Sequence, residues 1–246
     1  RSYEYVNSYY SFQKIIVKMK HYFLVAATAL LVLSGLSSCS KDTPDVPPTP
    51  PTKSEAGFVH SVNIGENTYV SLFKDLTAGS LNTDNALVFA KGAFSFVHGG
   101  KVYVTDTEHL YKYAPKDGKL VQEGTTMVFP SGAKATYITV ASNKKAYVSC
   151  LGIGKVWIID PSSMTKTGEI DLSDYSLGKS SGDNNPEPSA SVIRDGILYV
   201  SLNQMKSAYS CETGAYVALI DTKTDKPIKL ISDSRVTMSS SGTPAG

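Results

Sequence analysis

A short pattern that recurs along this chain limits what the chain can fold into. Its core is Tyr-Val followed by Ser or Thr. The copies are Thr68-Tyr69-Val70-Ser71, Lys101-Val102-Tyr103-Val104-Thr105, Lys145-Ala146-Tyr147-Val148-Ser149 and Ile197-Leu198-Tyr199-Val200-Ser201. The central valines are separated by 34, 44 and 52 residues. A strand that recurs at such a period predicts an array of β units, each too small to bury its own faces.

The later copies each have companion strands. The chain predicts a strand before each copy at 93–97, 136–140 and 189–193, a third strand at 109–113, 155–160 and 216–221, and a fourth strand at 119–121, 167–172 and 227–231. The turns Gly99-Gly100 and Asp195-Gly196 suit tight hairpins because glycine accepts positive φ. Four antiparallel strands in about 44 residues are typical of a β-propeller blade.

The strand composition also favours blades. Both faces are apolar in Val156-Trp157-Ile158-Ile159 and in Val217-Ala218-Leu219-Ile220. A blade between two neighbours buries both faces, whereas a surface sheet alternates apolar and polar residues. The predicted fold class is therefore all-β, a propeller of four-stranded antiparallel blades. Residues 54–246 have room for about four of them.

The end of the chain points to a longer protein. Residues 239–246 parallel the Ser-rich loop at 180–189, which leads into a new blade. We therefore expect the blades at 54–246 to be an incomplete part of a larger ring.

The first 38 residues predict export. We interpret residues 1–18 as an upstream segment ahead of an initiator Met19, and residues 19–38 as a signal peptide. Phe23–Leu33 is an uncharged run of 11 residues, far below the roughly 20 needed to span a bilayer. The following Leu36-Ser37-Ser38-Cys39 resembles the lipobox of bacterial lipoproteins, which implies lipidation of Cys39.

Residues 39–53 predict a tether between this lipid anchor and the domain. Five prolines fall within residues 44–51, which favours an extended polyproline II spacer. Ser40-Lys41-Asp42 loosely resembles signals that send lipoproteins to the outer leaflet, so we expect an outer-membrane protein exposed at the cell surface. A plain solvated linker is the alternative.

Charge argues against nucleic-acid binding. The whole chain has a net charge of +2, and residues 1–38 account for +3. The mature part is therefore near −1, which leaves no basic field to attract a polyanion.

Two cysteines besides Cys39 remain to be placed. Cys150 ends a predicted strand and Cys211 lies in a polar loop. An exported protein can form a disulfide, but spacing alone does not decide whether these two pair. Dispersed cysteines and histidines give no metal-binding pattern, and we predict no cofactor.

Candidate binding residues come from the unit with the longest period. It carries two polar insertions, between Ser176 and Pro188 and between Asn203 and Gly214. Long loops on a rigid scaffold are frequent binding sites, although each residue can equally belong to a tolerated surface insertion. The candidates are Lys179, Asn184, Asn185, Arg194, Asn203, Lys206 and Tyr209.

Catalytic signatures are absent from the sequence. It has no Gly-x-Ser-x-Gly, P-loop, His-Glu-x-x-His or Cys-x-x-Cys-His pattern. Gly152-Ile153-Gly154 lies between two predicted strands and reads as a hairpin turn. Asp160 and Asp221 each follow a third strand, where a carboxylate can accept hydrogen bonds from turn amides. We predict no catalytic residue.

The units around Tyr147-Val148-Ser149 and Tyr199-Val200-Ser201 resemble YncE-like, quinoprotein-dehydrogenase-like propellers. That resemblance covers residues 58–246 and implies a ring of seven or eight blades. With the lipobox, the chain is similar to bacterial propeller lipoproteins linked to TonB-dependent transporters. Some of those capture ferric siderophores at the cell surface. The chain departs from the dehydrogenases because it has no identifiable quinone or haem site.

The resemblance implies a binding lipoprotein that takes a small ligand, with a ferric siderophore as the specific expectation, and passes it to an outer-membrane transporter. A non-catalytic scaffold or adhesin is the alternative. A lactonase- or dehydrogenase-like enzyme is the third hypothesis, and it would need a metal or quinone at the central channel.

Overall fold

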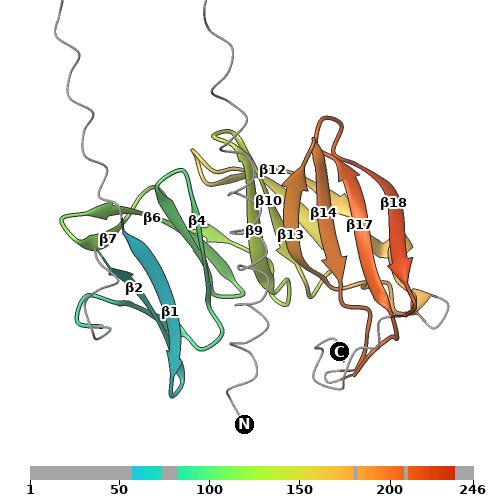
Figure 1. Ribbon diagram of the computed structural model, residues 1–246, viewed down its shortest axis with the longest axis horizontal. Helices are drawn as coiled ribbons and strands as arrows, with labels where there is room; N and C mark the ends of the chain where they lie inside the picture. The colour runs from blue at the N-terminus through green and yellow to red at the C-terminus, as the bar shows by residue number, and fades with distance from the viewer. Residues whose placement is uncertain (1–56, 74–82, 180–181, 208–209, 236–246) are drawn as a thin grey trace, which may run out of the picture. The chain divides into compact units, whose positions relative to one another are not determined.

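The computed structural model describes residues 57–73, 83–179, 182–207 and 210–235. They form antiparallel sheets that follow one another along the chain (Figure 1). The first sheet is β1 (Phe58–Ile64), β2 (Asn67–Phe73) and β3 (Leu87–Ala90). The second is β4 (Phe94–His98), β5 (Lys101–Thr105), β6 (His109–Lys116) and β7 (Lys119–Gln122), with β8 (Met127–Val128) also paired to β6.

The third and fourth sheets each have four strands. The third is β9 (Ala135–Ser142), β10 (Lys145–Cys150), β11 (Lys155–Asp160) and β12 (Thr165–Asp171). The fourth is β13 (Pro188–Arg194), β14 (Ile197–Leu202), β17 (Ala215–Asp221) and β18 (Lys226–Asp233). A separate small hairpin of β15 (Met205–Ser207) and β16 (Ser210–Cys211) lies in the connection from β14 to β17, which pair directly with each other. The predicted fold class is confirmed.

The predicted hairpin turns are also confirmed. Gly99 and Gly100 have φ of 56° and 74°, and Asp195 and Gly196 have 50° and 76°. Positive φ at both central residues matches the twist of the strands on either side, and Gly-Gly and Asp-Gly are the pairs that adopt it most easily. Local chemistry therefore determines where these strands reverse.

The third sheet buries both of its faces, as its composition predicts. On β10, Tyr147 packs toward the fourth sheet and Val148 toward the second. On β11, Val156 packs toward the fourth sheet and Trp157 toward the second. Side chains alternate across a strand, so one apolar run supplies two separate cores. All of Tyr147, Val148 and Val156 are fully buried.

The first sheet departs from the repeat. In the third sheet the tyrosine of the pattern faces the following sheet, but in the first sheet it is Val70 that packs against the following sheet, next to Val102 and Val104. Buried Thr68 lies on the same side, and its Oγ1 accepts hydrogen bonds from the amides of Gly92 and Ala93, at 3.0 and 3.3 Å. A shift of one residue along a strand moves every side chain to the other face. The Tyr-Val-Ser pattern at 69–71 therefore does not orient its side chains as the same pattern does in the third sheet.

Neighbouring sheets meet along their first strands, as blades of a propeller do. β1 lies beside β4, β4 beside β9, and β9 beside β13. Hydroxyl pairs join two of these contacts. Ser61 and Ser95 lie 2.6 Å apart between β1 and β4, and Thr139 and Ser191 lie 2.7 Å apart between β9 and β13. The described part of the chain contains no helix long and apolar enough to cross a membrane.

Candidate functional site

Two inserted loops leave the fourth sheet at the same end. The first connects β12 to β13 and begins with a short 3₁₀ turn, η1 (Ser173–Tyr175). The second connects β14 to β17 and contains the β15–β16 hairpin. Pro188, the first residue of β13, pairs with Leu202, the last residue of β14. The sheet register therefore brings the two loops together.

Gln204 ties these loops to each other. Its side chain is only 3% exposed, and its Oε1 accepts a hydrogen bond from the Leu177 amide at 3.0 Å. Its Nε2 donates to the Tyr175 carbonyl at 2.7 Å, and its own carbonyl accepts from the Glu212 amide at 2.8 Å. A buried amide side chain has to satisfy both its donor and its acceptor, and here both are satisfied by the opposite loop.

Two residues of this junction have a left-handed backbone. Glu187 has φ of 49° and Gln204 has φ of 48°. The Asn203 amide donates to the Glu187 carbonyl at 3.1 Å, and the Gln204 amide donates to the Pro186 carbonyl at 3.3 Å. Non-glycine residues with positive φ persist where their surroundings hold them, and these two amide hydrogen bonds do so here.

The first loop is also held to the third sheet. Asn185 Nδ2 donates to the Leu151 carbonyl at 3.0 Å, and Asn185 Oδ1 accepts from the Glu187 amide at 3.0 Å. The turn at Gly152-Ile153-Gly154 is confirmed, and Gly154 has φ of 66°. A Cβ at Gly154 would lie 2.9 Å from Pro186 Cδ, so the loop packs directly on that glycine.

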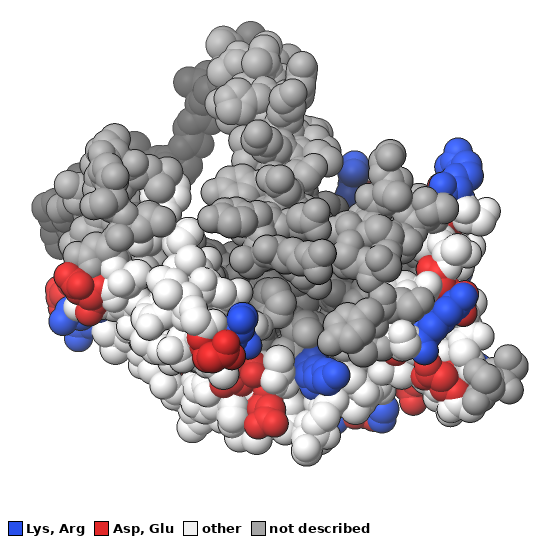
Figure 2. Space-filling model, turned by 90° about the horizontal axis from the view of Figure 1, so that it is seen from below, with Lys and Arg blue, Asp and Glu red and all other residues white. Residues whose placement is uncertain are grey.

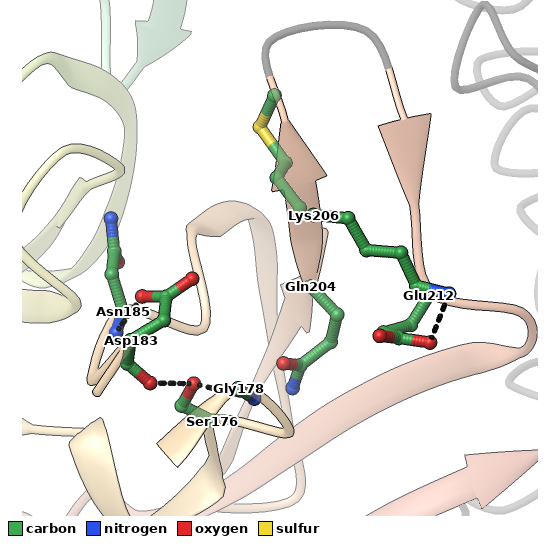
Figure 3. Close-up of a pocket in the computed structure, with 8 residues that line it drawn as sticks. Ser176, Gly178, Asp183, Asn185, Gln204, Lys206 and Glu212 are labelled. Carbon is green, nitrogen blue, oxygen red and sulfur yellow. Dashed lines mark hydrogen bonds and ion pairs between the residues drawn. The ribbon is translucent and has the colours of Figure 1, made fainter. Parts of the chain in front are cut away.

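The loops enclose a polar recess of about 200 Å³ (Figure 3). Its lining residues are Ser176, Gly178, Asp183, Asn185, Gln204, Met205, Lys206 and Glu212. Figure 3 shows Asp183 and Glu212 on opposite sides of Gln204, with Lys206 reaching toward Glu212. The Lys206 ammonium lies 2.9 Å from Glu212 Oε2.

Two of the predicted candidates, Asn185 and Lys206, line this recess. Lys179 and Asn184 lie exposed on the first loop, and Asn203 lies at the start of the second. These three residues are therefore on the same loops without lining the recess.

Arg194 and Tyr209 are placed differently. Arg194 ends β13 at the opposite end from the loops, about 20 Å from Pro188 at the strand rise of about 3.3 Å per residue. The structure therefore does not bring Arg194 to the recess. Tyr209 lies outside the described residues, as do Cys39, the signal peptide and the proline-rich tether.

Each described cationic candidate already pairs with a carboxylate. Lys179 pairs with Asp174, Lys206 with Glu212, and Arg194 with Asp195. Figure 2 likewise shows basic and acidic side chains next to each other on the face in view. The described loops therefore do not present the set of unpaired cations that an anionic ligand would require.

Six lining residues were not among the predicted candidates. They are Ser176, Gly178, Asp183, Gln204, Met205 and Glu212. The sequence shows only that these residues lie within or beside the insertions. Their approach depends on the pairing of Pro188 with Leu202, which a single sequence does not reveal.

A buried carboxylate lies next to the recess. Glu187 is 7% exposed, and its Oε2 accepts a hydrogen bond from the amide of the lining residue Met205 at 2.8 Å. Burial raises the pKa of Glu187, the Met205 hydrogen bond lowers it, and the nearby charge of Asp183 raises it further. Burial also raises the pKa of the Cys211 thiol, with the charge of Glu187 as a second cause.

Cys150 and Cys211 are both free thiols. Cys150 is buried in the core between the second and third sheets, whereas Cys211 pairs with Met205 in the loop hairpin. Among the described residues, no group of three or more His, Cys, Asp or Glu side chains is arranged to hold a metal ion.

Asp160 and Asp221, the last residues of β11 and β17, cap the turns that follow, as the sequence predicts. Asp160 Oδ1 accepts the Ser162 amide at 2.8 Å, and Asp221 Oδ1 accepts the Lys223 amide at 2.7 Å. The hydrogen bond from the Ser162 hydroxyl is the largest of the effects that lower the pKa of Asp160 to about 2. These carboxylates stabilise turns.

No family model and no curated protein matches this chain. Solved structures match it at low sequence identity. Hydrazine synthase of Kuenenia stuttgartiensis is 14% identical, with a TM-score of 0.47, over 70% of this chain and 45% of its own. Glutaminyl cyclase of Myxococcus xanthus is 15% identical, with a TM-score of 0.40, over 69% of this chain and 64% of its own.

Apo AztD of Citrobacter koseri is 15% identical, with a TM-score of 0.38, over 76% of this chain and 60% of its own. This chain thus spans between about half and two thirds of the length of these three structures. What identifies the architecture is the chain's own sheet order and interfaces: it is an all-β protein built from antiparallel blades of the β-propeller type.

Proposed function

We propose that this chain is an exported, lipid-anchored binding protein that holds a small polar ligand in the recess between its two inserted loops. The observation that carries this proposal is the Gln204 junction. Gln204 is 3% exposed, and its side chain links two long loops at one end of the fourth sheet. Loops fixed in this way on a rigid scaffold provide a preformed site, which lowers the entropic cost of binding.

The size of the recess favours a small ligand. It encloses about 200 Å³, whereas sites for drug-sized molecules are typically about 300–1,000 Å³. A ferric siderophore would have to extend beyond the recess. The volume therefore supports a smaller ligand than the siderophore that the family resemblance implies. Transfer of the ligand to a TonB-dependent transporter is part of the proposal and needs a separate test.

Membrane attachment is proposed through Cys39. The sequence Leu36-Ser37-Ser38-Cys39 supports it, and the proline-rich residues 39–53 would hold the blades away from the outer membrane. Labelled palmitate should be incorporated into the protein expressed in a bacterial host and lost in Cys39→Ala. Equal labelling of the two proteins would contradict anchoring at this residue.

The binding proposal is tested by ligand-observed NMR of the full chain against a library of small polar metabolites. We expect hits whose signals weaken in Lys206→Ala, because that side chain lines the recess. Lys229→Ala is the matched control, since Lys229 is an exposed lysine on β18. Hits that are equally sensitive to both variants, or a library with no hits, would reject the recess as a ligand site.

A scaffold function is the second candidate, and one observation favours it. The fourth sheet carries partly exposed apolar side chains, with Val192 45%, Ile228 50% and Ile231 44% exposed. Contiguous exposed apolar side chains mark protein contact sites, and Ile228 and Ile231 lie together on the edge strand β18. Cross-linking in the native membrane would identify partner proteins, and substitution of Ile231 by Asp should remove them while leaving small-molecule binding intact.

A further inference from the structure

The polar amides and hydroxyl that line the recess are already engaged in its wall. Ser176 Oγ donates to the Asp183 carbonyl at 2.7 Å and accepts the Gly178 amide at 3.2 Å. Asn185 and Gln204 each use both ends of their side-chain amide to hold the loops. A ligand that bonded these groups would have to break hydrogen bonds that build the site, so the charged side chains are the groups left to recognise it.

Carboxylates outnumber cations among those charged groups. Asp183 and Glu212 line the recess from opposite sides (Figure 3), and Lys206 is the cation of the lining. Lys206 is neutralised by Glu212. Asp183 Oδ1 accepts the Asn185 amide at 2.9 Å, and Asp183 forms no ion pair with any described residue. The lining therefore has an excess of one negative charge on the Asp183 side.

Glu187 gives an independent indication of the same kind. The residue is 7% exposed and lies behind the lining, where its Oε2 accepts a hydrogen bond from the amide of the lining residue Met205. Within the described part of the chain no cation pairs with it. A buried carboxylate is costly unless it is protonated or compensated by positive charge. The charge of Asp183 acts in the same direction, since it raises the pKa of Glu187. A cation bound at Asp183 would offset the negative charge that acts on Glu187.

The geometry of this cluster fits an organic cation better than a metal ion. The described side chains contain no group of three or more potential ligands arranged around one point. A primary ammonium has three N–H donors, of which one carboxylate can accept one in a charge-assisted bond while water accepts the others at an open recess.

We infer that the recess takes a small ligand that carries a primary ammonium group, with Asp183 as its main partner and Lys206 beside its polar remainder. This inference rests on the proposed function and names the ligand class for the same site. Because the recess encloses only about 200 Å³, the expected ligands are compounds of the size of amino alcohols and amino sugars.

The test is isothermal titration of the full chain with pairs of probes that differ only in the amine. The pairs are 2-aminoethanol with ethane-1,2-diol and glucosamine with glucose, and ferric citrate serves as the anionic probe. We expect at least one amine to bind 10-fold or more tightly than its neutral partner. We expect Asp183→Asn to reduce that preference to less than 3-fold. Asp174→Asn is the matched control, because Asp174 lies on the same loop and pairs with exposed Lys179.

Melting temperatures of the variants should be compared first, so that loss of binding is not loss of folding. If Asp183→Asn unfolds, Glu212→Gln is the second variant, and it should weaken the amine at least 3-fold. Equal affinity for an amine and its neutral partner, tighter binding of ferric citrate, or no binding of either amine would overturn the inference. Equal affinity or tighter binding of ferric citrate would still show that the protein binds small ligands. If neither amine binds, the screen of polar metabolites decides whether the recess binds a ligand at all.

Discussion

The phenol oxygen of Tyr147 on β10 donates a hydrogen bond of 2.5 Å to Asp225 Oδ1, in the turn that joins β17 to β18. The tyrosine and the aspartate belong to neighbouring sheets. Lys145 lies 2.7 Å from the other oxygen of the same carboxylate and donates to the Thr222 carbonyl at 2.9 Å. The apolar core between the third and fourth sheets is therefore closed at one end by a polar contact from one blade to the turn of the next.

Removal of this hydroxyl should weaken the interface without opening a cavity. Tyr147→Phe keeps the fully buried ring and leaves Asp225 with Lys145. We expect a loss of about 1.5–3 kcal/mol in the free energy of unfolding in urea, the range for a hydrogen bond to a charged group. Tyr199→Phe is the control at the same position of the fourth sheet and should change it by less than about 0.5 kcal/mol. Equal effects would mean that the Asp225 contact contributes nothing specific.

Alkaline pH should destabilise the domain through Tyr113. Burial, and then the charge of Asp106, raise the pKa of Tyr113 to about 12, above its ordinary value of 10. A raised folded-state pKa favours the neutral phenol, so this contribution is complete below about pH 10 and is lost as pH rises toward 12. Urea unfolding between pH 9 and 12 should show falling stability, with a shallower fall in Tyr113→Phe. Parallel curves for the two proteins would rule out this residue as the cause.

Gln204 should control the order of the loops more than the stability of the blades. Gln204→Ala leaves the Leu177 amide and the Tyr175 carbonyl without their present partner. An unsatisfied buried group costs about 1–3 kcal/mol, and local opening exposes it to water at less cost. Hydrogen exchange of the Leu177 amide should therefore accelerate at least 10-fold, while amides of β10 and β11 are unchanged.

The control for this variant is Gln122→Ala. Gln122 is exposed at the end of β7, and its Nε2 donates to Thr126 Oγ1 in the connection to β8 at 3.0 Å. Its substitution should leave the Leu177 amide protected. Unchanged exchange at Leu177 in Gln204→Ala would show that the loops hold together without this side chain.

Gly154 should be intolerant of a side chain for two separable reasons. Gly154→Ala places a Cβ at φ of 66°, which costs about 1 kcal/mol, and puts it 2.9 Å from Pro186 Cδ and 3.1 Å from Asn185 Oδ1. Gly65→Ala measures the first cost alone, because Gly65 has φ of 60° and nothing lies within 4 Å of its Cβ position. Thermal unfolding should show the larger loss for Gly154→Ala. Equal losses of stability in the two variants would mean that contact with Pro186 and Asn185 adds no cost at Gly154.

The strands and most of their turns follow from local sequence. Gly-Gly at 99–100 and Asp-Gly at 195–196 set positive φ locally, and Val156-Trp157 alternates across β11 so that both faces are buried. These features depend on the backbone preferences of a few consecutive residues and on the alternation of side chains between the two faces of a strand. The turn caps at Asp160 and Asp221 were predictable for the same reason.

Which faces and loops meet depends on contacts between distant segments. Val70 faces the following sheet although its pattern matches that of Val148, and Thr68 on the same side ties the strand to residues 24 and 25 positions away. Arg194 lies at the far end of β13, whereas Gln204 reaches Tyr175 across 29 residues of chain. Such contacts depend on strand register and on the packing of distant segments, and local composition carries no information about either. The physical reason is that the conformation of a strand is set by its own residues, whereas a binding site is set by the sum of many long-range contacts.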